Sequence, residues 1–242
     1  MNKKVAYLLA SLTIFSFIFF VVTRRTTEFQ LDVFNQFIPL LSKAFLNTLL
    51  VSVLALLGSI VLGFIFYLLS ISKYKYFNAL IDLFTEIIYG TPLLVMVVIT
   101  AFLIGPAFNT YNRNALGIAA LIFYMAPYMK NVFKSSIASV SSEQYLAMDL
   151  FQFTTYQRYR YIIIPQVIRV LMPPLMNNFS MIIKGSALLN VLSFNELYYA
   201  IAVIQSKTYA FVEGYIILWA LYLLITVPIS LLSKYVEKRW AL

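Results

Sequence analysis

Apolar residues along this chain gather in long runs, and the charged residues lie in the stretches between them. The runs are apolar on every side of a helix, whereas a membrane-spanning strand alternates in character over about ten residues. A helix needs about 20 apolar residues to cross a bilayer. The runs cover residues 5–22, 44–72, 87–112, 114–129 with a continuation to 137, 166–192 and 214–233. The pattern predicts an all-α, polytopic membrane protein with six transmembrane helices.

Glycine and proline interrupt two of the predicted spans. Gly90-Thr91-Pro92 lies near the start of the third run, and Pro173-Pro174 lies inside the fifth. Proline removes a backbone N–H and clashes with the preceding turn, so we expect a helix break at both places. Broken membrane helices are tolerated where neighbours bond the freed groups or where the backbone borders a cavity. Thr91 and Pro92 are therefore either a packing feature or part of a translocation pathway.

Composition supports the membrane class and removes several chemical functions. The chain is 62% hydrophobic and 11% charged, whereas soluble domains are about 45–50% apolar and about 25% charged. It contains no cysteine and no histidine, which excludes disulfides and the usual zinc and haem ligands. Nine acidic residues leave little material for acid–base catalysis. We therefore expect neither a bound metal or cofactor nor catalytic activity in this chain.

The first run follows Lys3-Lys4 and could be a signal peptide or an uncleaved anchor. It is long for the apolar core of a signal peptide, and Thr23-Arg24-Arg25 follows it in place of a small-residue cleavage site. These flanks favour a signal anchor and linker over residues 1–38, ahead of a transmembrane domain over 39–242. With the N-terminus inside, most basic residues fall on the cytoplasmic side, which predicts that both termini are cytoplasmic. The net charge of +9 then reflects topology rather than nucleic-acid binding.

The longest polar stretch, residues 130–169, falls on the cytoplasmic side in this topology. Ser141 and Thr154 each precede a short segment that can form a helix, and a serine or threonine in that position caps free N–H groups. Pro165 disfavours helix at Ile164 and marks the entry into the next span. The apolar side chains between the caps are more than a solvated loop needs. The loop is either an amphipathic element on the bilayer or a docking element for a soluble protein.

An ordered set of short motifs resembles one transporter family. The set comprises Asn47-Thr48-Leu49, Glu86 with Gly90-Thr91-Pro92-Leu93-Leu94-Val95, Ile162-Ile163-Ile164-Pro165-Gln166 followed by Arg169, Pro173-Pro174, Asn177, Phe179 and Lys184, and finally Glu196-Leu197. In this order and spacing, the chain resembles the permeases of polar amino acid ABC transporters. The resemblance covers most of the chain, from Asn47 to Leu197.

The resemblance implies a five-helix importer core, to which residues 5–22 add an N-terminal span. It also implies pairing with a second permease, identical or homologous, and a solute-binding protein outside the cytoplasmic membrane of a prokaryote. A coupling loop, here at about residues 139–164, would contact a cytoplasmic ATPase. The chain lacks the glycine-rich phosphate loop that ends in Gly-Lys-Ser/Thr. ATP and Mg are therefore expected on a separate subunit, and a polar amino acid or a related small solute is the expected cargo.

The coupling loop departs from the family pattern. Counting back from Pro165, the family's Glu-Ala-Ala…Gly falls on Leu146, Ala147, Met148 and Gln152, so that only Ala147 is kept. The family's glycine relaxes the turn between two coupling helices, and its loss puts the strength of the ATPase contact in question. The candidate ATPase contacts are Tyr145, Leu146, Ala147, Met148, Phe151, Gln152 and Pro165.

The fifth span departs as well. The family's Asn-Glu-Phe becomes Asn177-Asn178-Phe179, and its Lys-Asp-Thr-Ser becomes Lys184-Gly185-Ser186-Ala187. Acidic groups that could meet a substrate ammonium are thus absent there, as in the divergent half of a heterodimer or in a permease for an unusual ligand. The candidate pathway residues are Glu86, Thr91, Pro92, Asn177, Asn178 and Lys184.

Each pathway candidate also has a structural explanation. Glu86 could cap or pair near the cytoplasmic start of its span, and the two asparagines could join helices by hydrogen bonds. Lys184 lies about 27 Å along a helix from Gln166 and could reach the outer interface. Two other function classes remain open, a secondary transporter and a membrane scaffold. A secondary transporter usually carries acids at the bilayer midplane, and none lies clearly there.

Overall fold

The computed structural model describes residues 2–24 and 29–240. Arg25, one of the basic residues after the first predicted span, lies outside them. In chain order the helices are α1 (Lys3–Thr23), α2 (Ile38–Ser70), α3 (Lys75–Gly90), α4 (Leu93–Ile99), α5 (Gly105–Ala107), α6 (Arg113–Ala138), α7 (Ser142–Leu150), α8 (Thr155–Gln157), α9 (Ile164–Gly185), α10 (Leu197–Thr208) and α11 (Phe211–Trp240). The 3-10 segments Leu31–Phe37 and Ser186–Leu192 and the π-helical segments Thr100–Ile104 and Arg158–Ile163 connect them. The part of the chain that the structure describes contains no strand, and the all-α prediction is confirmed.

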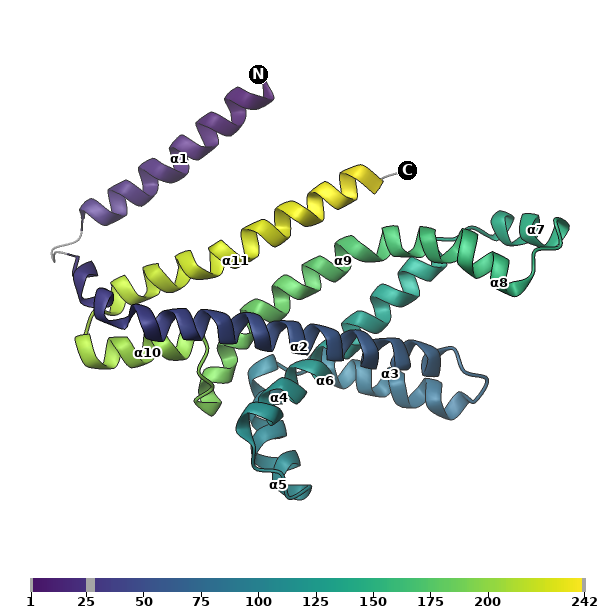
Figure 1. The fold of residues 1–242 in the computed structure, drawn as a ribbon, viewed down its shortest axis with the longest axis horizontal. Coiled ribbons are helices and arrows are strands. Elements are labelled where there is room, and N and C mark those ends of the chain that lie inside the picture. The colour runs from purple at the N-terminus through teal and green to yellow at the C-terminus, as the bar shows by residue number, and fades with distance from the viewer. Residues whose placement is uncertain (1, 25–28, 241–242) are drawn as a thin grey trace.

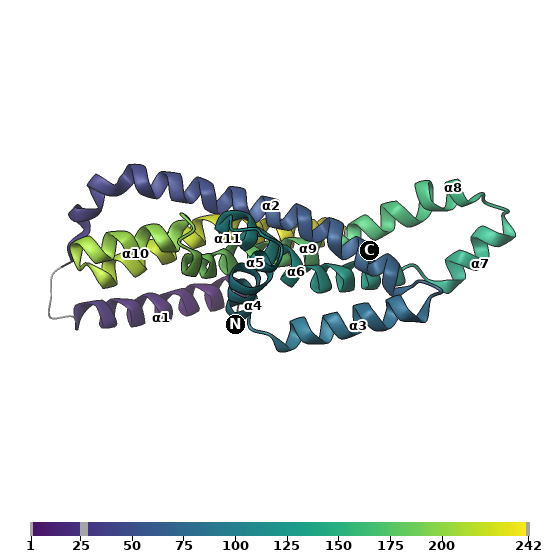
Figure 2. The same cartoon turned by 90° about the horizontal axis from the view of Figure 1, so that it is seen from below.

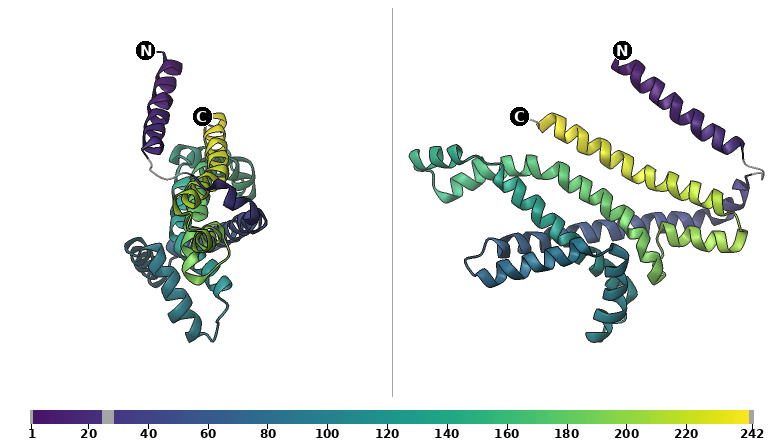
Figure 3. Two further views of the ribbon diagram at one scale, coloured as in Figure 1. Left: turned by 90° about the vertical axis from the view of Figure 1, so that its left-hand side faces the viewer. Right: turned by 180° about the vertical axis from the view of Figure 1, so that it is seen from behind.

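The molecule is elongated, and its long helices run roughly along the long axis (Figure 1). The short helices α7 and α8 project at one end, while α10 and the first turns of α2 and α11 form the other end. Figure 2 shows the same separation of the two ends from below. Helix α1 lies apart from the bundle in both views of Figure 3. The short helices therefore stand clear of the spans, where a soluble partner could reach them.

Helices α2 and α6 form the centre of the bundle because small residues let their backbones approach closely. Ala55 and Ala120 are fully buried in the same core cluster. A Cβ atom on Gly63 would collide with the side chain of Met129, and one on Gly58 would collide with Ile122. Without a hydrophobic driving force between helices in lipid, such close packing supplies much of their attraction. A second cluster joins α2, α10 and α11 around buried Leu197.

Length and apolar character identify the helices that can cross a membrane. Three of them qualify alone within the described residues: Leu31–Ser70, Arg113–Ala138 and Phe211–Arg239. Two bent pairs, Lys75–Gly90 with Leu93–Ala107 and Thr155–Leu192 with Leu197–Thr208, bring the number of spans to as many as five. Residues Val5–Val21 form a shorter apolar helix. A polytopic helical membrane protein is confirmed, and six as the number of spans stays a prediction.

The third predicted span differs from the structure. Helix α3 begins at Lys75 and bends by 113° into α4 across Thr91 and Pro92. Glu86 therefore lies eleven residues into a helix, about 17 Å from its first residue, and the predicted position at the start of a span was wrong. The run of uncharged residues began only after Glu86, so the charged but amphipathic helix before it was not recognised.

The predicted breaks at the later prolines were also wrong. Helix α9 continues through Pro173 and Pro174, and the hydroxyl of Ser233 on α11 lies 3.4 Å from the carbonyl oxygen of Pro173. Pro165 lies in the first turn of α9, where the sequence predicted the entry into this span, but helix does not stop before it, since the π-helical segment runs directly into Ile164. Proline has no N–H to donate, and at this position the preceding segment is π-helical, with the Ile164 N–H bonded to the Tyr159 carbonyl.

Lys130 lies inside α6, in the predicted helical continuation of the fourth run to residue 137. Its side chain is buried, and its Nζ donates a hydrogen bond of 2.9 Å to the Thr85 hydroxyl. The same nitrogen lies 3.7 Å from the carboxylate of exposed Asp82. These contacts attach α3 to α6. Lys130, which ends an uncharged run in the sequence, therefore acts here in helix packing.

Candidate functional site

The projecting loop begins with a capped helix, as the sequence predicted. The Ser141 hydroxyl oxygen accepts a hydrogen bond from the backbone N–H of Gln144 at the start of α7. Glu143 lies in the first turn, where a negative charge meets the positive end of the helix dipole. Hydrogen bonds from its own backbone N–H and from the Ser141 hydroxyl lower the pKa of the Glu143 carboxyl. The start of α7 is thus fixed by local contacts.

A second cap begins the return segment of the loop. The Thr154 hydroxyl accepts from the N–H of Gln157, and the Gln157 side chain accepts from the N–H of Thr154. This reciprocal arrangement is a capping box. Helix α8 is only one turn long and continues through the π-helical segment into α9. Because the backbone is helical from Thr155 to Gly185, movement of the loop can pass directly to α9.

Met148 faces the interior of the loop, which differs from the prediction that it contacts a partner. Its side chain is 2% exposed and packs with Val140 and Ile163. Phe153 and Val167 cover the same small cluster. Met148 therefore fastens α7 to the base of the loop, and it has no free surface to offer an ATPase.

The other apolar side chains of α7 face outward. Leu146 is 63% exposed, Leu150 83% and Phe151 76%. Tyr145, Ala147 and Gln152 are also exposed. Large apolar groups gathered on a projecting segment are typical of a surface that another protein covers. The structure thus brings together the predicted contacts of α7 except Met148, and Pro165 lies apart at the base of the loop.

A polar groove runs between α9 and α11. It has a volume of about 450 Å³. Its lining residues are Asn177, Ser180, Met181, Lys184, Thr226, Val227 and Ser230. These include two of the predicted pathway residues, Asn177 and Lys184, both of which are exposed. Polar and charged side chains inside a membrane face a cavity or a partner far more often than lipid. The contribution of α11 to this groove was not foreseen, because its polar residues are single hydroxyls in an apolar run.

The remaining pathway candidates lie outside the groove. The Asn178 side chain is buried and its Nδ2 lies 3.7 Å from the Met129 sulfur on α6, which is a helix–helix contact. Glu86 is exposed on α3. The Thr91 hydroxyl bonds back to the carbonyl of Ile87 at 2.6 Å.

The break before α4 nevertheless lies next to the Lys184 end of α9. A Cβ atom on Gly185 would lie 2.8 Å from the Leu93 side chain. Leu93 directly follows Pro92, and Gly185 directly follows Lys184. The break and the Lys184 end of the groove are therefore neighbours, although Thr91 and Pro92 do not line the groove.

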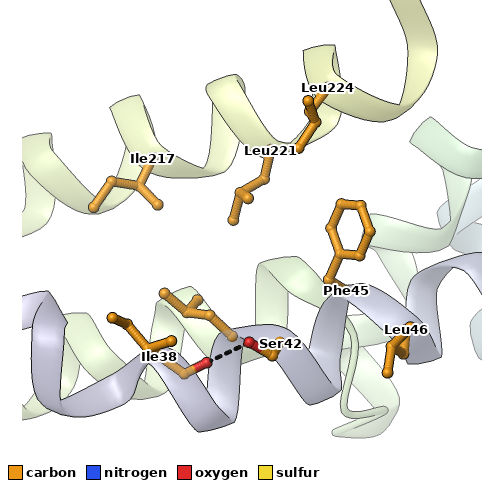
Figure 4. A pocket seen from close by; sticks show the side chains of 8 residues that line it. Ile38, Ser42, Phe45, Leu46, Ile217, Leu221 and Leu224 are labelled. Atoms are coloured by element: carbon orange, nitrogen blue, oxygen red, sulfur yellow. Dashed lines mark hydrogen bonds between the residues drawn. The ribbon is translucent and has the colours of Figure 1, made fainter. Parts of the chain in front are cut away.

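A second groove, between α2 and α11, has a different character. Its volume is about 500 Å³, and Figure 4 shows Phe45, Leu221 and Leu224 pointing into it. Its one hydroxyl belongs to Ser42 and bonds to the carbonyl of Ile38 on its own helix at 2.9 Å. This groove offers a polar solute no free group, so the α9–α11 groove is the better candidate for solute contact.

Glu196 has a structural role that the motif alone did not indicate. Its side chain is fully buried, and its two oxygens accept hydrogen bonds from the N–H groups of Tyr198 and Tyr199 at 2.9 and 2.7 Å. The Tyr222 hydroxyl of α11 donates a third bond at 3.0 Å. The neighbouring N–H of Leu197 donates to the Thr48 hydroxyl of α2 at 3.1 Å. Glu196 thus caps α10 and ties it to α11, while Leu197 ties α10 to α2. An acidic residue directly before an apolar helix is the signal that indicates such a cap.

Comparison with known proteins decides the family. Residues 59–242 match the family described as "Binding-protein-dependent transport system inner membrane component". The chain belongs to this family. It is therefore a transmembrane permease subunit of an ABC importer and is not itself catalytic.

Individual relatives agree with this assignment. The chain is 33% identical over 195 residues to the probable glutamine ABC transporter permease protein GlnM of Bacillus subtilis, covering 81% of this chain and 90% of the relative. It is 28% identical over 211 residues to the L-cystine transport system permease protein TcyB of Bacillus subtilis, covering 85% of this chain and 88% of the relative.

Solved structures support the fold. The crystal structure of an amino acid ABC transporter with histidines matches at a TM-score of 0.78 and 30% identity, covering 89% of this chain and all of that one. The inward-facing MetNI methionine ABC transporter matches at a TM-score of 0.64 and 15% identity, covering 84% of this chain and 98% of that one, which supports the fold alone.

Proposed function

We propose that this permease moves a polar amino acid or a close relative into the cell across the cytoplasmic membrane of a prokaryote. ATP, with Mg, would be hydrolysed on a separate cytoplasmic subunit that docks on α7. A second permease and an extracytoplasmic solute-binding protein would complete the transporter. The observation that carries the proposal is the exposed apolar surface of α7, defined by Leu146, Leu150 and Phe151, on a permease of this family.

The direction of the chain ends supports the proposed orientation. The C-terminal end of α11 and the N-terminal end of α1 both point toward the end of the molecule that carries α7 and α8 (Figure 1). If that end is cytoplasmic, both termini are cytoplasmic, in agreement with the distribution of basic residues. The ATPase would then meet α7 from the cytoplasm.

The α9–α11 groove supports an amino acid as cargo. Lys184 supplies a cation for a carboxylate, while Asn177 and the hydroxyls of Ser180, Thr226 and Ser230 supply neutral hydrogen-bonding groups. None of the residues that line the groove is acidic. A solute with a carboxylate and an uncharged polar side chain therefore fits this set better than a solute with a cationic side chain does. The names of the relatives, which refer to a glutamine ABC transporter, L-cystine transport and an amino acid ABC transporter with histidines, support the same class.

Reconstitution tests the proposal. The permease is placed in liposomes with its ATPase, its paired permease and its binding protein, and ATP-dependent uptake of labelled amino acids is measured. We expect uptake only when all components are present. Undiminished uptake without the ATPase or the binding protein would point to a secondary transporter, and docking without uptake would point to a scaffold.

A further inference from the structure

The turn after α7 has the geometry of a glycine-terminated helix but carries glutamine. The N–H of Phe153 donates to the carbonyl of Met148, and the N–H of Gln152 donates to the carbonyl of Asp149, both at 3.0 Å. This pair of bonds is the Schellman motif, in which the residue after the C-cap adopts the left-handed conformation. Gln152 does so, with φ of 55°. Because a Cβ atom disfavours that conformation, other contacts must hold the turn closed.

Arg158 supplies contacts on both sides of this turn. Its Nε donates a hydrogen bond of 2.8 Å to the carbonyl of Phe153. Its Nη1 lies 2.6 Å from a carboxylate oxygen of Asp149 near the end of α7. The Arg158 side chain is 28% exposed, against 60% for that of Asp149. One guanidinium, planar and rigid, thus joins the end of α7 to the segment that leads back to the membrane.

The loop has few other means of holding its shape. Helix α7 has nine residues, and isolated helices shorter than about 12–15 residues are marginal in water. Only Val140, Met148 and Ile163 form its buried cluster. The relative position of α7 and the π-helical segment therefore depends on a few cross-links, of which Arg158 makes two.

We infer that Arg158 is a positioning residue for energy coupling, since it holds α7 in the orientation that presents Leu146, Leu150 and Phe151 to the ATPase. The inference rests on the proposed docking function. Arg158 compensates for the glutamine at the turn, so that docking by the ATPase moves α7 and α9 as one body. Without this link, α7 could shift relative to α9 when the ATPase binds. ATP hydrolysis would then move α9 less.

Variants of the full permease, assembled with its partners, test the inference. We expect Arg158→Ala to weaken ATPase binding about tenfold and to raise the number of ATP molecules consumed per solute imported. Arg158→Lys keeps a charge for Asp149 but lacks Nε, so we expect only partial recovery. The matched control is Arg160→Ala, two residues further along, where an exposed arginine forms no ion pair with the rest of the described chain; we expect wild-type values.

The second-site variant Gln152→Gly distinguishes positioning from general damage. Glycine adopts the left-handed conformation freely, so Gln152→Gly in the Arg158→Ala background should restore ATPase binding and the ATP-to-solute ratio. Failure to restore either would overturn the inference, as would wild-type coupling in Arg158→Ala alone. Leu146→Arg is measured in parallel: if it too leaves ATPase binding unchanged, the docking proposal itself fails.

Discussion

Glu196 is expected to be the most sensitive polar position at the end of the molecule opposite α7. Glu196→Ala removes the acceptor for three donors, the N–H groups of Tyr198 and Tyr199 and the Tyr222 hydroxyl. Loss of a helix cap costs about 1 kcal/mol, and a donor left without a partner in a buried site costs about 1–3 kcal/mol. Polar contacts between membrane helices average a smaller value, about 0.6 kcal/mol.

Together these terms give an expected destabilisation of about 2–4 kcal/mol for Glu196→Ala. Glu196→Gln keeps the shape and one carbonyl-type oxygen, so we expect a loss of about 1 kcal/mol. The assay is reversible unfolding by SDS in mixed micelles, which yields the free energy of unfolding. Glu237→Ala, at an exposed position near the end of α11, is the control and should change it by less than about 0.5 kcal/mol. Equal free energies for Glu196→Ala and Glu237→Ala would refute the role of this network.

Two further predictions concern the turn and the groove. Gln152→Gly in the otherwise wild-type chain should stabilise the turn by about 0.5–1 kcal/mol and slow hydrogen exchange of the amides at positions 152 and 153. Faster exchange of these amides would contradict the strain argument. Gln144→Gly within α7 is the control, and it should speed exchange because glycine weakens the interior of a helix. Lys184→Gln should reduce the apparent affinity of the transporter for its solute, measured by uptake, by about 10–100-fold and leave ATPase binding unchanged. The control Lys43→Gln on α2 should leave both unchanged. Equal uptake by the two variants would remove Lys184 from the pathway.

The helices that the sequence predicted best are those whose hydrophobic runs need no tertiary contact to be recognised. The run from 114 through 137 became α6, and the caps at Ser141 and Thr154 formed as expected because they depend on neighbouring residues only. Helix α3 was missed because Asp82 and Glu86 interrupt its apolar run. Its polar contacts with Lys130 on α6 are visible only once the helices are packed.

Tertiary packing also decided the proline and methionine positions. Pro173 and Pro174 predict a break in an isolated helix, yet α9 continues through both and packs against α11. Met148 has the apolar character of its exposed neighbours, and its burial against Ile163 depends on the return of the chain fifteen residues later. Periodicity within α7 cannot reveal that contact.

The docking of an ATPase on α7 can be tested directly because the chain contains no cysteine. Leu146→Cys introduces a single thiol on the exposed face of α7, and Tyr209→Cys introduces one at an exposed position, 77% accessible, at the opposite end of the molecule. The measurement is the rate of maleimide labelling with and without the ATPase subunit. We expect the ATPase to slow labelling at position 146 and to leave labelling at position 209 unchanged. Labelling at position 146 that proceeds equally fast in the presence of bound ATPase would contradict the account.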